Sequence, residues 1–133
     1  MQMQEGLVAL LKASSALTAL IGTRVFAVEA PPDLADYPCM TYALVGGSSD
    51  LPFDNSGVTR QRVEFNGLSF KSYDEATKIR AAIAAAVDGW TQKLTDGTNI
   101  LNSVSLNPGT DFVTEQRCFR CLIEFYIDYT LPS

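Results

Sequence analysis

Hydrophobic residues recur with helical spacing at the start of the chain. From Met3 to Leu11, and again up to Ile21, they follow steps of three and four residues, which predicts a helix with one buried face. Ser14 interrupts this stretch and can cap a second helical segment, which Gly22 would end. The pattern therefore predicts a helix of about ten residues, a break, and a further helical turn.

A second helix is predicted where a capping motif precedes an alanine-rich stretch. In Ser72-Tyr73-Asp74-Glu75 the serine can cap the first turn while the glutamate reaches back to it, which is a capping box. Apolar residues then continue with helical spacing to Asp88, Gly89 would close the helix, and Trp90 is expected to cover one end of the core. The alanines allow this helix to pack closely against a sheet.

Five other stretches have the β-prone or alternating composition of strands. They are Arg24–Val28, Cys39–Val45, Val58–Phe65, Asn99–Leu106 and Phe119–Tyr129. In the third stretch, Val63 and Phe65 are expected to point one way. The residues expected on its opposite, solvated face are Arg60, Arg62 and Glu64.

The two C-terminal stretches carry the most regular pattern. In Phe119–Tyr129 every second residue is apolar, whereas Arg120, Glu124 and Asp128 fall on the other face, which is typical of a half-buried strand. In the preceding stretch, the residues expected to share one face are Ile100, Val104 and Leu106. Asn107-Pro108-Gly109 is expected to form the turn between the two strands.

The order of these elements predicts an α+β fold. A helix, three strands, a second helix and two strands, with connections typical of hairpins, favour an antiparallel or mixed sheet of about five strands. Two main helices are expected to pack on one face of this sheet. No repeat or linker divides the chain, so we expect a single domain over residues 1–133.

The composition favours a folded domain and disfavours several functions. The chain has 133 residues, 47% of them hydrophobic, and a formal charge of −5, which argues against a protein that grips the phosphate backbone. It contains no histidine, the commonest general base and metal ligand near neutral pH. Its three cysteines do not fit a secreted disulfide framework, and its N-terminal segment lacks the pattern of a signal peptide or membrane span. We therefore expect folding in a reducing cytoplasm and no membrane partner.

Several motifs could suggest chemistry, but each has a simpler structural explanation. Cys118-Phe119-Arg120-Cys121 is formally a C-x-x-C motif, yet in a strand its cysteines project to opposite faces, and Cys39 alone cannot complete a zinc site. Gly46-Gly47-Ser48-Ser49 lacks the lysine and the following helix of a phosphate-binding loop. The acidic pairs Asp74-Glu75 and Asp33/Asp36 fit a helix start and a proline-rich loop. We therefore predict no catalytic, metal or cofactor site, and a protein that is not an enzyme.

Acidic and basic residues are distributed unevenly. Between Glu29 and Gly57 there are five acidic residues and no lysine or arginine, whereas arginines recur on the later strands. Ordinary solvation of loops would explain this. The alternative is self-complementarity, in which acidic loops of one subunit meet basic strands of the next in a head-to-tail ring. On that alternative, the residues predicted at the subunit interface are Arg60, Arg62, Arg117 and Arg120.

Several segments, taken in order along the chain, resemble one known family. Ala16–Phe26 resembles its opening turn, glycine and arginine-led strand, and Tyr37–Tyr42 resembles its second strand. Arg62–Phe65 followed by Ser72–Ala76 is similar to its central strand and capped helix, and Phe119–Tyr129 to its aromatic-rich last strand. The family is the tail-completion proteins of long-tailed phages, also called tail terminators or head-to-tail joining proteins. One departure is Gly67-Leu68-Ser69, where relatives often carry a more aromatic or charged step.

The resemblance implies a structural virion protein at the head-proximal end of the tail, assembled in the host cytoplasm. Members form a ring, typically a hexamer, that stops polymerisation of the tail tube and joins the tail to the neck. The implied partners are further copies of the chain, the tail tube protein and a neck or connector protein. DNA would pass through the ring without sequence-specific binding.

The loop predicted over Gly46–Gly57 is long for a small domain, and such loops are usually functional or disordered. In a tail terminator, it could become ordered on contact with tube or neck proteins. The residues predicted to contact a partner or the lumen are Asp50, Leu51, Pro52, Phe53 and Asp54. An acidic lumen would discourage the phosphate backbone from sticking, and we hypothesise that Glu29–Asp54 contributes to it.

Two other functions remain open. The chain could be a head–tail connector or neck subunit, because ring subunits of both kinds are small and acidic. It could also be a small ligand-binding α+β domain, because a fold alone does not determine function. A buried apolar pocket with convergent polar groups would favour the last of these.

Overall fold

The computed structural model of the chain describes residues 2–28, 37–45, 49–50, 58–113 and 118–130. Its helices are α1 (Gln2–Ala13), α2 (Ser15–Ile21) and α3 (Tyr73–Val87). The predicted break is confirmed, because the side chain of Ser14 caps α2 by accepting a hydrogen bond from the backbone N–H of Leu17. Gly22 ends α2 with a φ of 62°, a conformation that favours glycine.

The strands form one mixed sheet. They are β1 (Val25–Ala27), β2 (Cys39–Leu44), β3 (Ser49–Asp50), β4 (Val58–Ser69), β5 (Gln92–Lys93), β6 (Asn99–Val113) and β7 (Cys118–Thr130). Their order is β1-β2-β4-β7-β6-β5, and β3 pairs with β4 as well. β1 runs parallel to β2, and the other pairs are antiparallel. The predicted α+β class is confirmed, whereas the short strands β3 and β5 were not predicted and raise the strand count.

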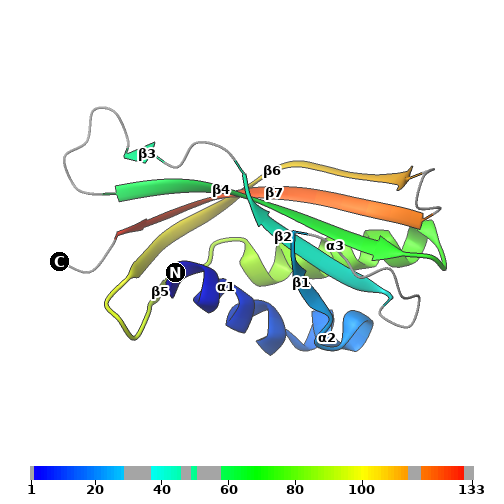
Figure 1. Cartoon of the computed structure of the whole chain (residues 1–133), viewed down its shortest axis with the longest axis horizontal. Coiled ribbons are helices and arrows are strands. Elements are labelled where there is room, and N and C mark those ends of the chain that lie inside the picture. Colours follow the sequence, from blue (N-terminus) through cyan, green and yellow to red (C-terminus); the bar gives the residue numbers. More distant parts are fainter. Residues whose placement is uncertain (1, 29–36, 46–48, 51–57, 114–117, 131–133) are drawn as a thin grey trace.

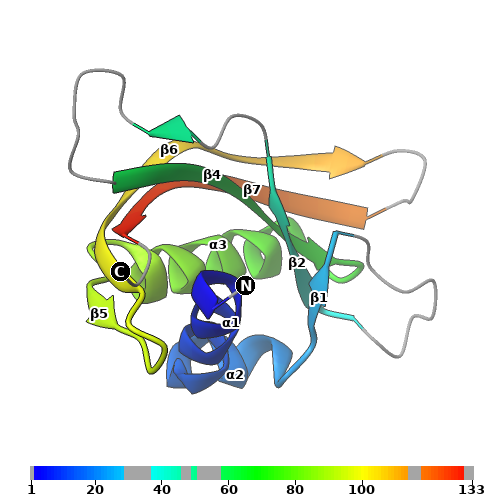
Figure 2. The same ribbon diagram turned by 60° about the vertical axis from the view of Figure 1, so that its left-hand side comes forward.

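The core lies between the sheet and the helices. Figure 1 shows the helices on one face of the sheet, and Figure 2 shows the sheet curling over α3. Phe65 of β4 and Phe125 of β7 are fully buried, with ring centroids 5.8 Å apart, and they belong to the same apolar cluster as Ile79 and Ile83 of α3. Burying a side chain of this size contributes about 1.5–3 kcal/mol, so this cluster is the main source of stability. The buried faces predicted for both strands are confirmed.

The start of α3 differs in one detail from the predicted capping box. Ser72 caps the helix as expected, because its Oγ accepts a hydrogen bond from Glu75 N at 3.0 Å. The carboxylate of Glu75, however, accepts from the Oγ of Ser69 at 2.7 Å instead of returning to the Ser72 backbone. The Oγ of Ser69 in turn accepts from the backbone N–H groups of Lys71 and Ser72. One buried serine at the end of β4 therefore joins the strand, the turn and the helix.

β6 contradicts two predictions. The register against β7 shifts between Ile100 and Asn102, so that Ile100 points into the core while Val104 lies on the opposite face and is 46% exposed. The residue that points inward after the shift is Ser103, which is buried. An extra residue in a strand reverses the faces of everything that follows, and alternation cannot reveal it. The predicted turn at Asn107-Pro108-Gly109 is also wrong, because β6 continues through it with a second register shift between Leu106 and Gly109.

Candidate functional site

The face of the sheet turned away from the helices, called the polar face below, carries charged side chains on its two central strands. They are Arg60, Arg62 and Glu64 on β4, and Arg120, Glu124 and Asp128 on β7. The same alternation that directs Val63 and Phe125 into the core directs these residues outward. The placement predicted for both groups is confirmed.

Arg60 and Asp128 form a bidentate pair across the two strands. They lie directly opposite each other, and Arg60 donates two hydrogen bonds to the carboxylate, over 2.7 Å from Nε and 3.0 Å from Nη2. The guanidinium carbon also lies 5.2 Å from the centroid of the Tyr126 ring, within cation–π range. The hydrogen bond to Asp128 raises the pKa of Arg60 above its ordinary value. These contacts together hold the arginine in one orientation.

Arg62 pairs diagonally with Glu124, although the residue directly opposite it is Tyr126. This diagonal pairing places a positive charge beside Glu124. The residue directly opposite Glu124 is Glu64, and like charges in that position repel. Glu124 is only 6% exposed, and a buried carboxylate needs a partner. Its hydrogen bond with Arg62 supplies one and raises the pKa of that arginine, while Asn66 donates to the carboxylate of Glu64.

These contacts refine the predicted subunit interface. Arg60, Arg62 and Arg120 do share one face, but carboxylates stand between them, so the polar face is balanced in charge and not a basic stripe. Arg117, the fourth predicted residue, lies outside the described residues. The arginines could be placed from alternation alone, whereas their acidic partners depend on the register of two distant strands. The assignment of these residues to an interface stays a prediction.

Of the residues predicted to contact a partner or the lumen, only Asp50 is among the described residues. This residue lies in β3 and is paired with Thr59 of β4, one position before Arg60. β3 therefore stands beside the end of the polar face where the pair Arg60–Asp128 lies. Residues 51–54, which complete the predicted contact set, lie outside the described residues, as does most of the acidic stretch 29–54.

The three cysteines occupy two separate apolar environments. Cys118 and Cys39 are buried with Leu68 in a small cluster, whereas Cys121 is buried in the main core. The two cysteines of the C-x-x-C motif therefore project to opposite faces of β7, as predicted. Burial raises the pKa of the Cys121 thiol to about 11. A thiol in that environment is protonated at neutral pH and is a poor nucleophile or metal ligand.

Aromatic side chains gather at the corner between β4 and α3, and this cluster was not predicted from the sequence. The rings of Tyr37 and Phe70 are in edge contact with centroids 4.5 Å apart, and Tyr73 meets Phe119 in the same way at 6.4 Å. Tyr73 is 56% exposed, and Phe70 also lies largely at the surface. A pocket of about 380 Å³ is lined by Tyr37, Pro38, Phe70, Lys71 and Glu75. Exposed aromatic residues around a hollow are typical of contact surfaces, so this corner is a second candidate.

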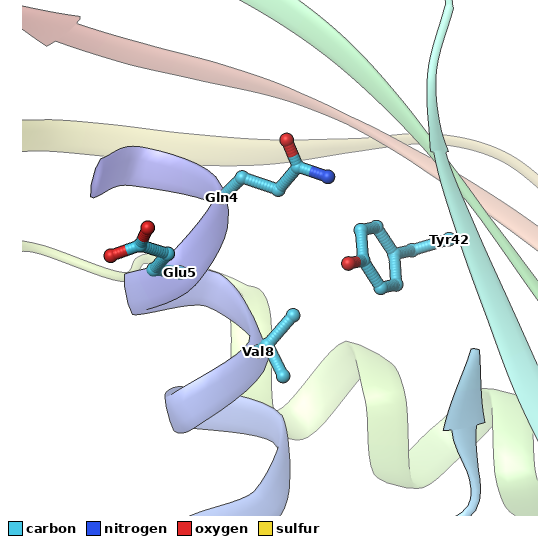
Figure 3. Close-up of a pocket in the computed structure, with 4 residues that line it drawn as sticks. All are labelled: Gln4, Glu5, Val8 and Tyr42. Atoms are coloured by element: carbon cyan, nitrogen blue, oxygen red, sulfur yellow. The ribbon is translucent and has the colours of Figure 1, made fainter. Parts of the chain in front are cut away.

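A wider hollow of about 470 Å³ separates α1 from β2 and is lined by Gln4, Glu5, Val8 and Tyr42. Figure 3 shows the Tyr42 hydroxyl facing α1, with Val8 and the Gln4 amide turned toward it and the Glu5 carboxylate turned away. The hollow is open and its polar groups do not converge on one point, which is unlike a small-molecule site. It gives no support to the ligand-binding alternative.

Within the described residues, no three side chains of histidine, cysteine, aspartate or glutamate gather closely enough to hold a metal ion. No helix in this part of the chain is long and apolar enough to cross a membrane. The features on which a function can be argued are therefore the polar face, the aromatic corner and the edges of the sheet.

Comparison with known families shows to which family the chain belongs. A family model described as tail completion protein gp17 matches residues 5–129. The chain belongs to this family. The match covers all three helices except the first residues of α1, and every strand except the last residue of β7. It is therefore a structural protein of a phage tail, and its place is in the virion, as the resemblance in the sequence implied.

Solved structures agree with the fold of this tail completion protein. One is a chain from the virion of a native gene transfer agent particle, at 20% identity and a TM-score of 0.75, with 96% of this chain and 94% of that chain covered. A second solved chain matches at 12% identity and a TM-score of 0.58, with 98% and 99% covered. No curated protein sequence matches this chain. At these identities, the likeness shows that the fold is shared.

Proposed function

We propose that this tail completion protein forms a ring, a hexamer in the intact tail, at the head-proximal end of the tail tube. The ring stops tube polymerisation and joins the tail to a neck or connector protein, and DNA passes through its lumen. The observation that carries this proposal is the family match, which extends over residues 5–129 and so over nearly the whole chain. The role requires binding surfaces and no catalysis.

The polar face supplies the ring interface in this proposal. Arg60 and Arg62 keep 41% and 42% of their side chains exposed while paired with acids of their own subunit. The exposed N–H groups of the two guanidinium groups can therefore donate further hydrogen bonds to carboxylates of a neighbouring subunit, so that the charge network continues between subunits. Arg120, on the same face, and Arg117 complete the set predicted from the sequence.

An exchange of charges tests this interface without removing the pair inside the subunit. The double variant Arg60→Asp with Asp128→Arg keeps an arginine–aspartate pair across the strands but exchanges the two charges that face a neighbour. We expect the monomer to keep its fold by circular dichroism and the ring to weaken. A double variant that assembles as readily as the native chain would remove these residues from the interface.

The acidic segment before β4 supplies the lumen in this proposal. Asp50 of β3 pairs with Thr59 of β4, and Asp54 follows in the segment predicted to contact partners or to line the lumen. Reversing both charges should impair DNA delivery and leave ring assembly unchanged, because only the repulsion of phosphates is lost. Normal infection by a phage with both reversals would exclude a role in the lumen.

The proposed function is tested first by mass in solution. Light scattering behind a sizing column is run on the chain alone and with purified tube protein, and a discrete ring is expected in at least the second run. A monomer in both runs would contradict termination of the tube. Phage that lack the protein should also make overlong tubes, whereas tubes of normal length would favour the neck or connector alternative.

A further inference from the structure

The helix layer carries an apolar groove of about 420 Å³ between α2 and α3. Its lining includes Leu20 and exposed alanines of both helices, which are Ala16, Ala19, Ala81 and Ala85. Among the described residues that line the groove, only Lys78 is charged. The solvent-facing side of a helix normally carries charged residues, so this groove is a candidate contact surface.

The groove and the polar face lie on different sides of the subunit. The helices cover one face of the sheet, and the polar face is the other (Figure 1, Figure 2). In a ring, each subunit meets its two neighbours through two unlike surfaces, since a contact between identical patches would close a dimer instead. A ring interface on the polar face therefore requires a different, complementary surface on the next copy.

The polar face presents an exposed apolar side chain in the same row as an exposed arginine. Val104 of β6 lies opposite Tyr126 of β7, which lies opposite Arg62 of β4. Val104 is 46% exposed, and its strand, Asn99–Val113, contains no lysine or arginine. Neighbouring strands are about 4.8 Å apart, so Val104 and Arg62 stand about 10 Å from each other.

The helix layer has the complementary features at the same spacing. Asp74 of α3 is 76% exposed, and its carboxylate lies 3.1 Å from the Nζ atom of Lys78 at the rim of the groove. Ala81, within the groove, follows Asp74 by seven residues, which is about 10 Å along a helix that rises 1.5 Å per residue. The two surfaces therefore match in charge, in apolar character and in the distance between the two.

We infer that the polar face of one copy docks on the helix layer of the next, with Val104 seated in the groove between α2 and α3 and Arg62 donating to Asp74. The inference rests on the proposed ring and names the surface that its polar face meets. Arg62 uses Nε for its hydrogen bond with Glu124 and keeps 42% of its side chain exposed. Further N–H groups of its guanidinium group are therefore available to a carboxylate of the neighbour.

Disulfide trapping on the full chain tests this contact. In the variant Val104→Cys with Ala81→Cys, oxidation of the assembled protein should give a ladder of covalent oligomers up to the whole ring, because each new thiol meets one on a neighbour. The three native cysteines are buried and should not take part. Each single variant lacks the partner thiol and should stay monomeric. The matched control is Val104→Cys with Ala13→Cys, at an exposed alanine of α1 outside the groove, which should also stay monomeric.

The concentration needed for ring formation tests the apolar and the charged parts separately. Ala81→Arg places a charged side chain in the groove and should raise this concentration about tenfold or more, whereas Ala13→Arg should not. Arginine is a good helix former at exposed positions, so both monomers should keep their fold. Asp74→Asn should raise the concentration about two- to fivefold, whereas Asp88→Asn, at the other end of α3, should leave it unchanged.

The outcomes separate this inference from the function on which it rests. A ring in which Val104→Cys with Ala81→Cys gives no ladder, or which Ala81→Arg leaves as stable as the native ring, would overturn the docking and leave the proposed function standing. Covalent dimers of Val104→Cys alone would also overturn it, because two polar faces would then be meeting. A chain that forms no ring, alone or with tube protein, would overturn both.

Discussion

Gly67 of β4 lies so close to Ile79 of α3 that an added Cβ atom would come within 2.5 Å of the Ile79 Cγ2 atom. The same Cβ would meet the Sγ atom of Cys121 at 2.5 Å. The helix therefore rests on the backbone of the sheet at this point, and any side chain would push the two layers apart. This close approach explains why a glycine occupies position 67.

Gly67→Ala is expected to destabilise the monomer by about 1–3 kcal/mol, because a well-packed core has no room for another methyl group. Gly6→Ala is a matched control, since its Cβ would meet only the flexible end of Leu94, at 2.9 Å, and alanine favours the helix. The free energy of unfolding in urea measures both. Equal stability of Gly67→Ala and the native chain would show that the layers can separate without cost.

Ser103→Ala should cost about 0.5–1.5 kcal/mol, because two hydrogen bonds of the hydroxyl are lost while Trp90 N keeps its hydrogen bond to Val87 O at 3.0 Å. The Oγ of Ser103 accepts from Trp90 N at 2.9 Å and donates to the carbonyl of Val87 at the end of α3. Ser105→Ala, at an exposed position on the same strand, should change the unfolding free energy by less than about 0.5 kcal/mol. Similar losses in both variants, measured by urea unfolding, would contradict this role of the hydroxyl.

The pair Arg60–Asp128 should show a coupling energy of up to about 1 kcal/mol in a double-mutant cycle with alanine, and salt should weaken it. The reference is the pair Lys78–Asp74 on α3, whose side chains are 64% and 76% exposed and whose coupling should be about 0.3–0.5 kcal/mol. The bidentate geometry and lower exposure of Asp128 predict the larger value for the first pair. A smaller coupling for Arg60–Asp128 would mean that its geometry adds nothing.

Stability should fall above about pH 9 because of Cys121. Burial raises the pKa of its thiol to about 11 in the folded chain, from an ordinary value of 9.0 for an exposed thiol. The contribution is thus complete below pH 9 and is lost as pH rises toward 11, because only the unfolded chain ionises readily in that range. Between pH 8 and pH 10, the native chain should lose about 1 kcal/mol more than Cys121→Ala, with reductant present. Parallel curves for the two chains would show that the thiol is not shielded.

Much of the fold followed from local patterns in the sequence. The strict alternation of β7, the break at Ser14 and the cap at Ser72 each depend on residues within a few positions, and each was placed correctly. The faces of β6 were predicted wrongly because it has an extra residue near Leu101. This residue reverses the faces of all the residues that follow, and the composition of the strand does not reveal it. Pro108 suggested a turn, but a strand can hold a proline where its pairing is irregular.

The candidate site could likewise be predicted only as far as it depends on local sequence. Arg60, Arg62 and Arg120 could be assigned to one face from alternation, because that property is local. Their pairing with Asp128 and Glu124 required the register of β4 against β7, which is fixed by contacts some sixty residues apart along the chain. The edges of the sheet could not be identified at all before the strand order was known.

The absence of lysine and arginine from Asn99–Val113 also has a consequence for the life of the unassembled subunit. An edge strand without lysine or arginine can pair with the strands of a misfolded chain, so the free chain is expected to aggregate. Its solubility should therefore depend on how quickly growing tails consume it. Overproduction without the other tail proteins should yield precipitate that a single lysine at Val104 reduces.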